Sequence, residues 1–225
     1  MPGWWVTQTL SAPNGTVLLA SHIFWVIFAI VLHELAHGWA AMACGDDTPR
    51  ATGHMTWNPV VHMGVPSLFM FALIGIAWGA MPVNPSRFRR ASDDAIVALA
   101  GPLMNIALVL LTLPALAAWI LLTRQVTVPA HVQANIFTFL YIGSVLNIAL
   151  ALFNLLPVPP LDGSRILSVF VPAYRNLFAS EIGRVAMIIL MVVLFTQGGT
   201  YIFGAGHYVV NAFITAVIPA LPTTP

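Results

Sequence analysis

The sequence contains very little charge. Only 7% of its 225 residues are charged and 59% are hydrophobic, whereas about 25% of the residues of a soluble domain are charged. This difference excludes an ordinary soluble domain. It predicts an all-α polytopic membrane protein in which residues 1–225 form a single integral-membrane domain within the lipid bilayer. The formal net charge of +1 provides no basic surface, so we expect no nucleic-acid partner.

Cysteine and N-terminal basic residues are also scarce. Cys44 is the single cysteine, which excludes an intrachain disulfide and favours a buried small residue. No Lys or Arg precedes the first apolar run in residues 1–15. The sequence therefore lacks the charged start of a signal peptide, and we expect the first hydrophobic segment to be retained as a span.

Long charge-free stretches predict the membrane spans, because about 20 apolar residues cross a bilayer. A stretch without formal charge runs from Val185 to Pro225, interrupted by Gly198 and Gly199, which predicts a helical hairpin. We therefore expect about five transmembrane helices, with the N-terminus outside and the C-terminus inside. They lie near residues 17–43, 95–123, 132–156, 182–196 and 201–219.

The apolar segment from Met63 to Pro82 is interrupted by proline and glycine. Its unbroken core, Ser67 to Trp78, has 12 residues, and segments of about 10–14 residues more often re-enter than span. A re-entrant segment places seven arginines on one side of the membrane and only Arg124 on the other. A spanning segment gives six and two, so the positive-inside rule favours re-entry. Both arrangements stay open at this point.

The pentad His33-Glu34-Leu35-Ala36-His37 lies within the first apolar stretch. On a helix it places two imidazoles one turn apart on the same face, where both reach one metal ion. Glu34 can then act as a base on a metal-bound water. Ionisable groups in hydrocarbon cost roughly 3 kcal/mol even on the gentlest scale, and they mark functional sites. The pentad predicts a metalloprotease that acts inside a membrane.

A catalytic zinc site usually has a third protein ligand. Asp162 follows Asn154-Leu-Leu-Pro-Val-Pro-Pro-Leu, where three prolines break a long apolar helix. Irregular backbone at membrane depth is tolerated only inside protein or beside a water-filled cavity. Asp162 is thus the strongest candidate for a third ligand, and an N-cap next to Gly163 is the alternative.

These motifs resemble a known family. H-E-L-A-H in the first span and N-L-L-P-V-P-P-L-D-G after a later one resemble the two signature motifs of the site-2 protease family of intramembrane zinc metalloproteases. A-G-P-L-M-N at residues 100–105 resembles that family's third recurring element. The resemblance extends over roughly residues 32–165. Ser164 stands where many relatives have a second glycine, and no insertion resembles a PDZ or CBS domain.

The resemblance implies a function and a site. His33, His37 and Asp162 would bind one Zn²⁺ per chain, and Glu34 would be the catalytic base. The substrate would be a single-span transmembrane protein, cut near the cytosolic face in regulated intramembrane proteolysis. The resemblance also suggests an edge strand near residues 78–83 that holds the substrate extended. We expect a multi-pass protein of the cell membrane, in a prokaryote the plasma membrane, and the sequence predicts no oligomeric state.

Three asparagines and one glycine near these motifs are also interpreted from the sequence. Asn154 either contacts the substrate or the oxyanion, or forms an interhelical hydrogen bond. Asn147 is interpreted as an interhelical hydrogen bond, and Gly101 with Asn105 as a close helix contact.

The alternative function is a non-proteolytic metal-binding membrane scaffold or a metal transporter. A transporter is expected to have more intramembrane carboxylates or repeated half-structures, whereas Glu34 is the single acidic residue within a predicted span.

Overall fold

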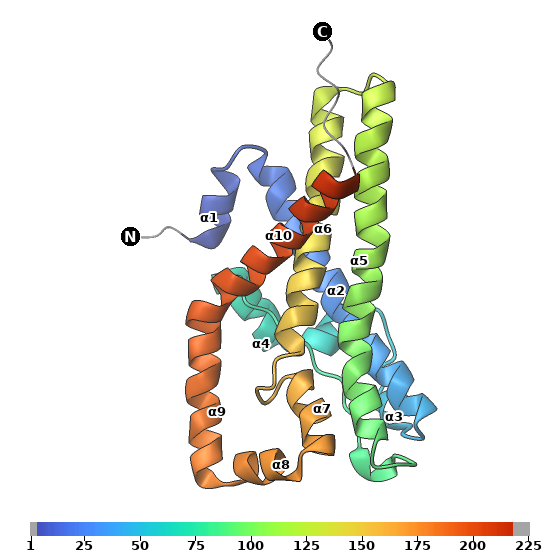
Figure 1. The fold of residues 1–225 in the computed structure, drawn as a ribbon, viewed down its shortest axis with the longest axis vertical. Coiled ribbons are helices and arrows are strands. Elements are labelled where there is room, and N and C mark those ends of the chain that lie inside the picture. Colours follow the sequence, from blue (N-terminus) through green and yellow to red (C-terminus); the bar gives the residue numbers. More distant parts are fainter. Residues whose placement is uncertain (1–3, 218–225) are drawn as a thin grey trace.

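The computed structural model describes residues 4–217, except for five side chains between residues 178 and 195. This part of the chain is helical and contains no strand (Figure 1). Within it, four helical stretches are long and apolar enough to cross a membrane. The expected all-α polytopic fold is confirmed. The four stretches are α2 (Gly15–Ala43), α5 (Asp93–Gln125), α6 (Ala130–Asn154) and Val185–Val217.

Helices α2, α5 and α6 form the centre of the molecule. Figure 1 shows α5 and α6 side by side along the long axis of the molecule. Leu32 of α2 and Leu108 of α5 belong to one buried apolar cluster, while Leu116 and Val145 belong to another that joins α5 to α6. Since lipid provides no hydrophobic driving force between helices, this close packing stabilises the bundle.

The segment after α2 folds back on itself, which is the path that a re-entrant segment requires. Helix α4 (Pro59–Ile74) has a kink at Gly64, whose φ is +67°, and ends at Gly75 in the left-handed conformation. The chain then returns to the end of α2 at which it started. There the Asn84 amide donates to Asp46 (2.6 Å), and the Arg89 amide donates to the Cys44 carbonyl (3.1 Å).

Asp46 is the fully buried residue that anchors this return. Burial by itself would raise the pKa of its carboxyl, but hydrogen bonds from Asn84 and Thr48 hold the pKa below its ordinary value. The carboxylate is therefore charged near neutral pH. Its contribution to stability is present above the ordinary aspartate pKa and is lost as the pH falls through the lowered value.

The N-terminal helix α1 (Trp5–Leu10) contacts the far end of α4. The indole nitrogens of Trp4 and Trp5 donate to the Ala72 carbonyl, and that of Trp4 also approaches the Leu73 carbonyl. These carbonyls belong to the last turn of α4, where no intrahelical partner follows. The tip of the re-entrant helix is thus held by the N-terminal segment.

The expected hairpin after residue 182 is wrong. Helix α9 (Glu181–Val193), a π-helical turn (Leu194–Gly198) and α10 (Gly199–Val217) form one bent path instead (Figure 1). Gly199 has right-handed helical angles, φ −54° and ψ −46°, so the chain does not reverse there. Helical glycine costs only about 1 kcal/mol relative to alanine, less than leaving the backbone groups of a loop unpaired in lipid.

The count of candidate spans is therefore four instead of about five. Val210 of α10 belongs to the cluster that joins α5 to α6, and Ile214 lines a groove with Arg124 at the end of α5. The end of α10 thus lies at the Arg124 end of the bundle, opposite to the side expected for the C-terminus. Residues 218–225 themselves lie outside the described part of the chain.

Candidate metal centre

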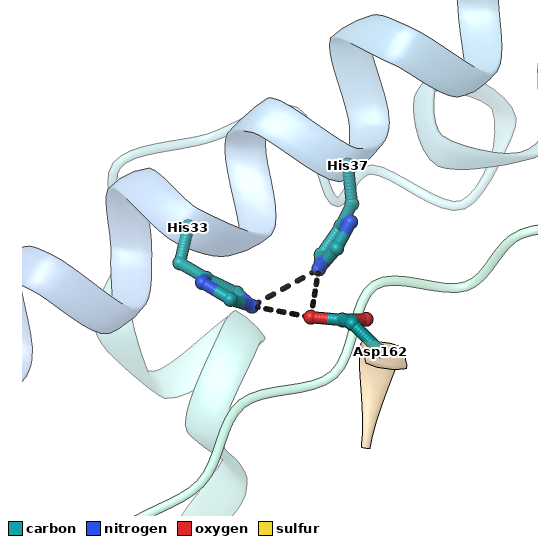
Figure 2. Close-up of side chains that lie close together, drawn as sticks. All are labelled: His33, His37 and Asp162. Carbon is teal, nitrogen blue, oxygen red and sulfur yellow. Dashed lines mark hydrogen bonds and ion pairs between the residues drawn. The ribbon is translucent and has the colours of Figure 1, made fainter. Parts of the chain in front are cut away.

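Two histidines of α2 meet the first residue of α7 (Asp162–Phe170) in the interior. Figure 2 shows the three side chains pointing toward one another. His33 Nε2 and His37 Nε2 lie 3.2 and 3.3 Å from Asp162 Oδ2, and 3.0 Å from each other. Each residue is at most 7% exposed. The three atoms form a small triangle, the arrangement of a three-ligand metal site.

The second nitrogen of each imidazole determines which atoms face this triangle. His33 Nδ1 lies 2.7 Å from Asn105 Oδ1, and His37 Nδ1 lies 2.7 Å from the Val97 carbonyl. Both partners are oxygens that only accept, so each Nδ1 carries the proton and donates. In the neutral imidazole each Nε2 is then the unprotonated acceptor. When both rings are neutral, no proton lies between the two Nε2 atoms, although they are only 3.0 Å apart.

With both imidazoles neutral, three electron pairs converge with no proton between them. Asp162 Oδ2 is buried and has no hydrogen-bond donor among the described residues. Such an arrangement is repulsive unless a metal ion or a shared proton lies among the three atoms. Imidazole nitrogen and carboxylate oxygen are ligands that zinc accepts in catalytic sites, with a fourth position open for water. The donor set fits zinc.

Gly101 of α5 keeps the space beside the imidazoles open. A Cβ at this position would collide with Nε2 of both His33 and His37. Any larger residue would occupy the volume that the converging atoms leave for an ion. Helix α5 therefore contributes to the site by having no side chain at residue 101.

The backbone before α7 explains the position of Asp162. Prolines 157, 159 and 160 lack the amide proton needed to continue α6, so the helix ends at Asn154. Gly163 approaches the Leu155 carbonyl so closely that a Cβ would collide with it. Leu161 is the N-cap of α7, and no side chain caps it. Asp162 is therefore not an N-cap, the alternative that the sequence left open.

A cavity of about 630 Å³ opens beside the triangle. Glu34 lines it and lies against Gly79, where a Cβ would come within 2.5 Å of Glu34 Oε1. Asn154 also lines the cavity, and its Nδ2 donates to the Leu150 carbonyl of its own helix (3.0 Å). That bond is intrahelical and differs from the interhelical bond that was the alternative for Asn154.

Other histidine and aspartate side chains near the site have different partners. His62 Nε2 pairs with the Thr56 carbonyl, and His54 pairs with Thr52. Asp94 forms an ion pair of 2.6 Å with Arg165, which itself lines the cavity. Among the described residues, the cluster of possible metal ligands contains His33, His37 and Asp162. It does not include His54, His62 or Asp94.

Gly101 and Asn105 contribute to the centre in ways that the sequence does not indicate. The sequence predicts a close helix contact for both, yet Gly101 makes room for the imidazoles and Asn105 accepts a hydrogen bond from His33. Their spacing of four residues equals that of His33 and His37. This equal spacing was the one sign in the sequence that residues 101 and 105 could face residues 33 and 37 from a neighbouring helix.

A buried pair of histidines, a carboxylate and an adjacent glutamate inside a helical membrane bundle define the intramembrane zinc protease class. The comparisons with known proteins agree. The model of peptidase family M50 matches residues 21–197. The chain belongs to this family, the site-2 proteases, and it is an intramembrane zinc metalloprotease.

Several similar proteins are named "Putative zinc metalloprotease". YwhC of Bacillus subtilis is 31% identical, over 79% of this chain and 81% of its own length. MJ0611 of Methanocaldococcus jannaschii is 29% identical, over 70% and 74%. Rip2 of Mycolicibacterium smegmatis is 32% identical over 61% of this chain, but only 52% of its own length is covered. No solved structure gives a significant match.

Proposed function

We propose that this protease cuts single-span transmembrane proteins near the cytosolic face, with His33, His37 and Asp162 as the zinc ligands and Glu34 as the general base. The observation that carries the ligand set is the convergence of three buried acceptor atoms without a donor. One zinc ion per chain satisfies all three atoms, whereas a purely structural cluster would need a shared proton.

Glu34 performs the proton transfers in this mechanism. Bound zinc supplies Lewis-acid polarisation of the peptide carbonyl and makes a water acidic near neutral pH. Glu34, in the cavity wall next to His33, accepts the proton of the attacking water and later donates it to the leaving nitrogen. Asn154 has a second amide hydrogen and presents it to the substrate or to the developing oxyanion.

The depth of the site, between the centre of the membrane and the end of α2 at Ala43, supports access from that face. His37 and His33 lie six and ten residues before Ala43, the last residue of α2, or about 9 and 15 Å at the rise of an α-helix. The hydrocarbon core is about 30 Å thick. The same end of α2 adjoins the arginine-rich segment of residues 87–90, which the positive-inside rule assigns to the cytosol. We place the protein in a prokaryotic plasma membrane, because the similar Bacillus and Methanocaldococcus proteins come from prokaryotes.

The non-helical segment after α4, residues 76–84, supports the proposed mode of substrate binding. The backbone amide and carbonyl of Trp78 bond to Ser67 Oγ, and the Ala80 amide donates to the His62 carbonyl. Gly79, between the two, lines the cavity, and its backbone has no hydrogen-bond partner within residues 4–217.

A substrate peptide that pairs with Gly79 would lie extended across the cavity by β-augmentation. The substrate helix must unwind locally to do so, because helical peptide bonds are already paired internally. Substrates with Gly, Pro or Asn near the scissile bond are therefore cut faster than Leu-rich ones. Equal rates across such a series in a reconstituted assay would contradict this mode of binding.

Zinc content and cleavage together test the site. Purified protein should contain about one zinc per chain, and His33→Ala, His37→Ala and Asp162→Ala should each lose most of it. Glu34→Gln should keep its zinc, while cleavage of a single-span substrate falls about 10²–10⁴-fold. Full zinc occupancy in Asp162→Ala would remove Asp162 from the ligand set, and normal turnover by Glu34→Gln would remove the base.

A further inference from the structure

A chain of buried amides connects the proposed metal centre to the backbone of a third helix. His33 Nδ1 donates to Asn105 Oδ1 (2.7 Å), Asn105 Nδ2 donates to Asn147 Oδ1 (3.1 Å), and Asn147 Nδ2 donates to the Gly143 carbonyl (2.8 Å). The chain runs from α2 through α5 to α6. Asn105 and Asn147 are both 0% exposed, so water does not compete for these bonds.

The direction of this chain follows from its end point. A backbone carbonyl only accepts, so Asn147 must present its NH₂ group to Gly143 and its oxygen to Asn105. Asn105 then presents its NH₂ group to Asn147 and its oxygen to His33. His33 must therefore carry a proton on Nδ1, and in the neutral imidazole this leaves the electron pair of Nε2 directed at His37 and Asp162.

We infer that Asn105 and Asn147 are positioning residues that select the metal-binding tautomer of His33. This inference rests on the proposed role of His33 as a ligand and extends it to two residues that touch no reacting atom. Hydrogen-bonded partners of metal-binding histidines commonly fix ring orientation, and their loss costs about 10–100-fold in metal affinity. Asn147 acts on His33 indirectly, through Asn105. Without Asn147, the Asn105 amide is free to turn its NH₂ group toward His33.

The bundle contains a matched control one to two turns away. Ser144 Oγ donates to Thr112 Oγ1 (2.9 Å), a second buried polar contact between the same helices α5 and α6. Thr112 lies seven residues after Asn105, and Ser144 three residues before Asn147. Neither Thr112 nor Ser144 hydrogen-bonds to an imidazole. Thr112→Val therefore removes a buried interhelical bond without affecting His33.

Zinc affinity, measured by competition with a chelator, tests the relay. Asn105→Leu should bind zinc about 10–100-fold more weakly than wild type, and Asn147→Leu should also be weakened. Thr112→Val should bind normally. Asn105→Asp keeps an oxygen acceptor for His33 Nδ1 and should restore much of the affinity that Asn105→Leu loses. Equal affinities of Asn105→Leu and Thr112→Val would overturn the inference.

A spectroscopic measurement can be made on the unmodified chain, so its result does not depend on whether a variant folds. In metal-free protein with ¹⁵N-labelled histidine, the His33 signals should show a protonated Nδ1 and an unprotonated Nε2; the opposite tautomer would overturn the inference. His33→Ala separates the two levels of the proposal. Zinc loss in His33→Ala without loss in Asn105→Leu refutes the relay alone, and zinc retention in His33→Ala refutes the ligand set.

Discussion

At the residue scale, the candidate centre depends on an absence as much as on its side chains. The proposed ligands come from α2 and α7, but the space that they share exists because α5 has glycine at position 101. The glutamate is adjacent to another glycine, Gly79, in the same way. Small residues at close contacts between membrane helices are usually explained by packing. Here two of them border the groups that we propose to perform the chemistry.

Gly101→Ala tests this role. The added methyl group collides with Nε2 of His33 and His37 and displaces the imidazoles, so we expect most of the zinc to be lost. Activity should fall about 100-fold, the usual effect of a displacement near 1 Å. Gly204→Ala is the matched control, because a Cβ at this helical position of α10 meets no atom within 4 Å. Normal zinc content in Gly101→Ala would show that the cavity is larger than the structure indicates.

At the element scale, short segments hold the parts of the site in place. Helix α7, which begins with Asp162, is tied to the start of α5 by the ion pair of Arg165 and Asp94. The extended segment over Glu34 is tied to α4 by Ser67. Neither α7 nor this segment crosses the membrane, so each depends on these side-chain bonds for its position.

The Asp94–Arg165 pair is suited to a charge exchange. The two side chains are 25% and 28% exposed. Asp94→Arg and Arg165→Asp should each lower the free energy of unfolding by about 1–3 kcal/mol, the usual effect of losing a hydrogen bond between charged groups. Both should also weaken zinc binding, because Asp162 is one turn from Arg165. The double variant should recover both properties, measured by thermal unfolding and by zinc content. Failure of the double variant to recover would show that the pair does not position α7.

Ser67→Ala should separate substrate binding from metal binding. Ser67 is fully buried, and its removal leaves the amide and carbonyl of Trp78 unpaired, at about 1–3 kcal/mol for each buried group. We expect a higher KM for a transmembrane substrate and an unchanged zinc content. Ser168→Ala, which removes a hydroxyl bonded only within α7, should leave KM unchanged. Loss of zinc in Ser67→Ala would argue for a general structural role.

At the scale of the whole molecule, the re-entrant segment and the unbroken α9–α10 path determine the topology. Because the chain returns at Asn84 to the same end of α2, α2 and α6 run in the same direction. The histidines near the end of α2 and Asp162, which follows the end of α6, are therefore at a similar depth. The path from α9 to α10 ends beside Arg124, which makes the number of crossings even.

Cysteine labelling with a membrane-impermeant reagent in a Cys44→Ser background tests this topology. Asp47→Cys and Ser92→Cys should react from the cytosolic side, and Gln125→Cys from the outside. Val217→Cys distinguishes the two arrangements of the last helices. It should react from the outside if α9 and α10 form a single bent span, and from the cytosol if they form the hairpin. Labelling of positions 47 and 92 from opposite faces would contradict re-entry.

The sequence by itself determined what depends on local periodicity and on hydrophobicity. The pairing of His33 with His37 follows from helical spacing, and the limits of α2, α5 and α6 lie within a few residues of those expected. Tertiary structure decided the rest. The approach of Asp162 to the histidines, the bond of Asn105 to His33 and the gap at Gly101 are contacts between residues distant in the chain. The continuation through Gly199 was also decided there, because glycine permits both a turn and a helix, and only the packing of α10 on α5 and α6 distinguishes them.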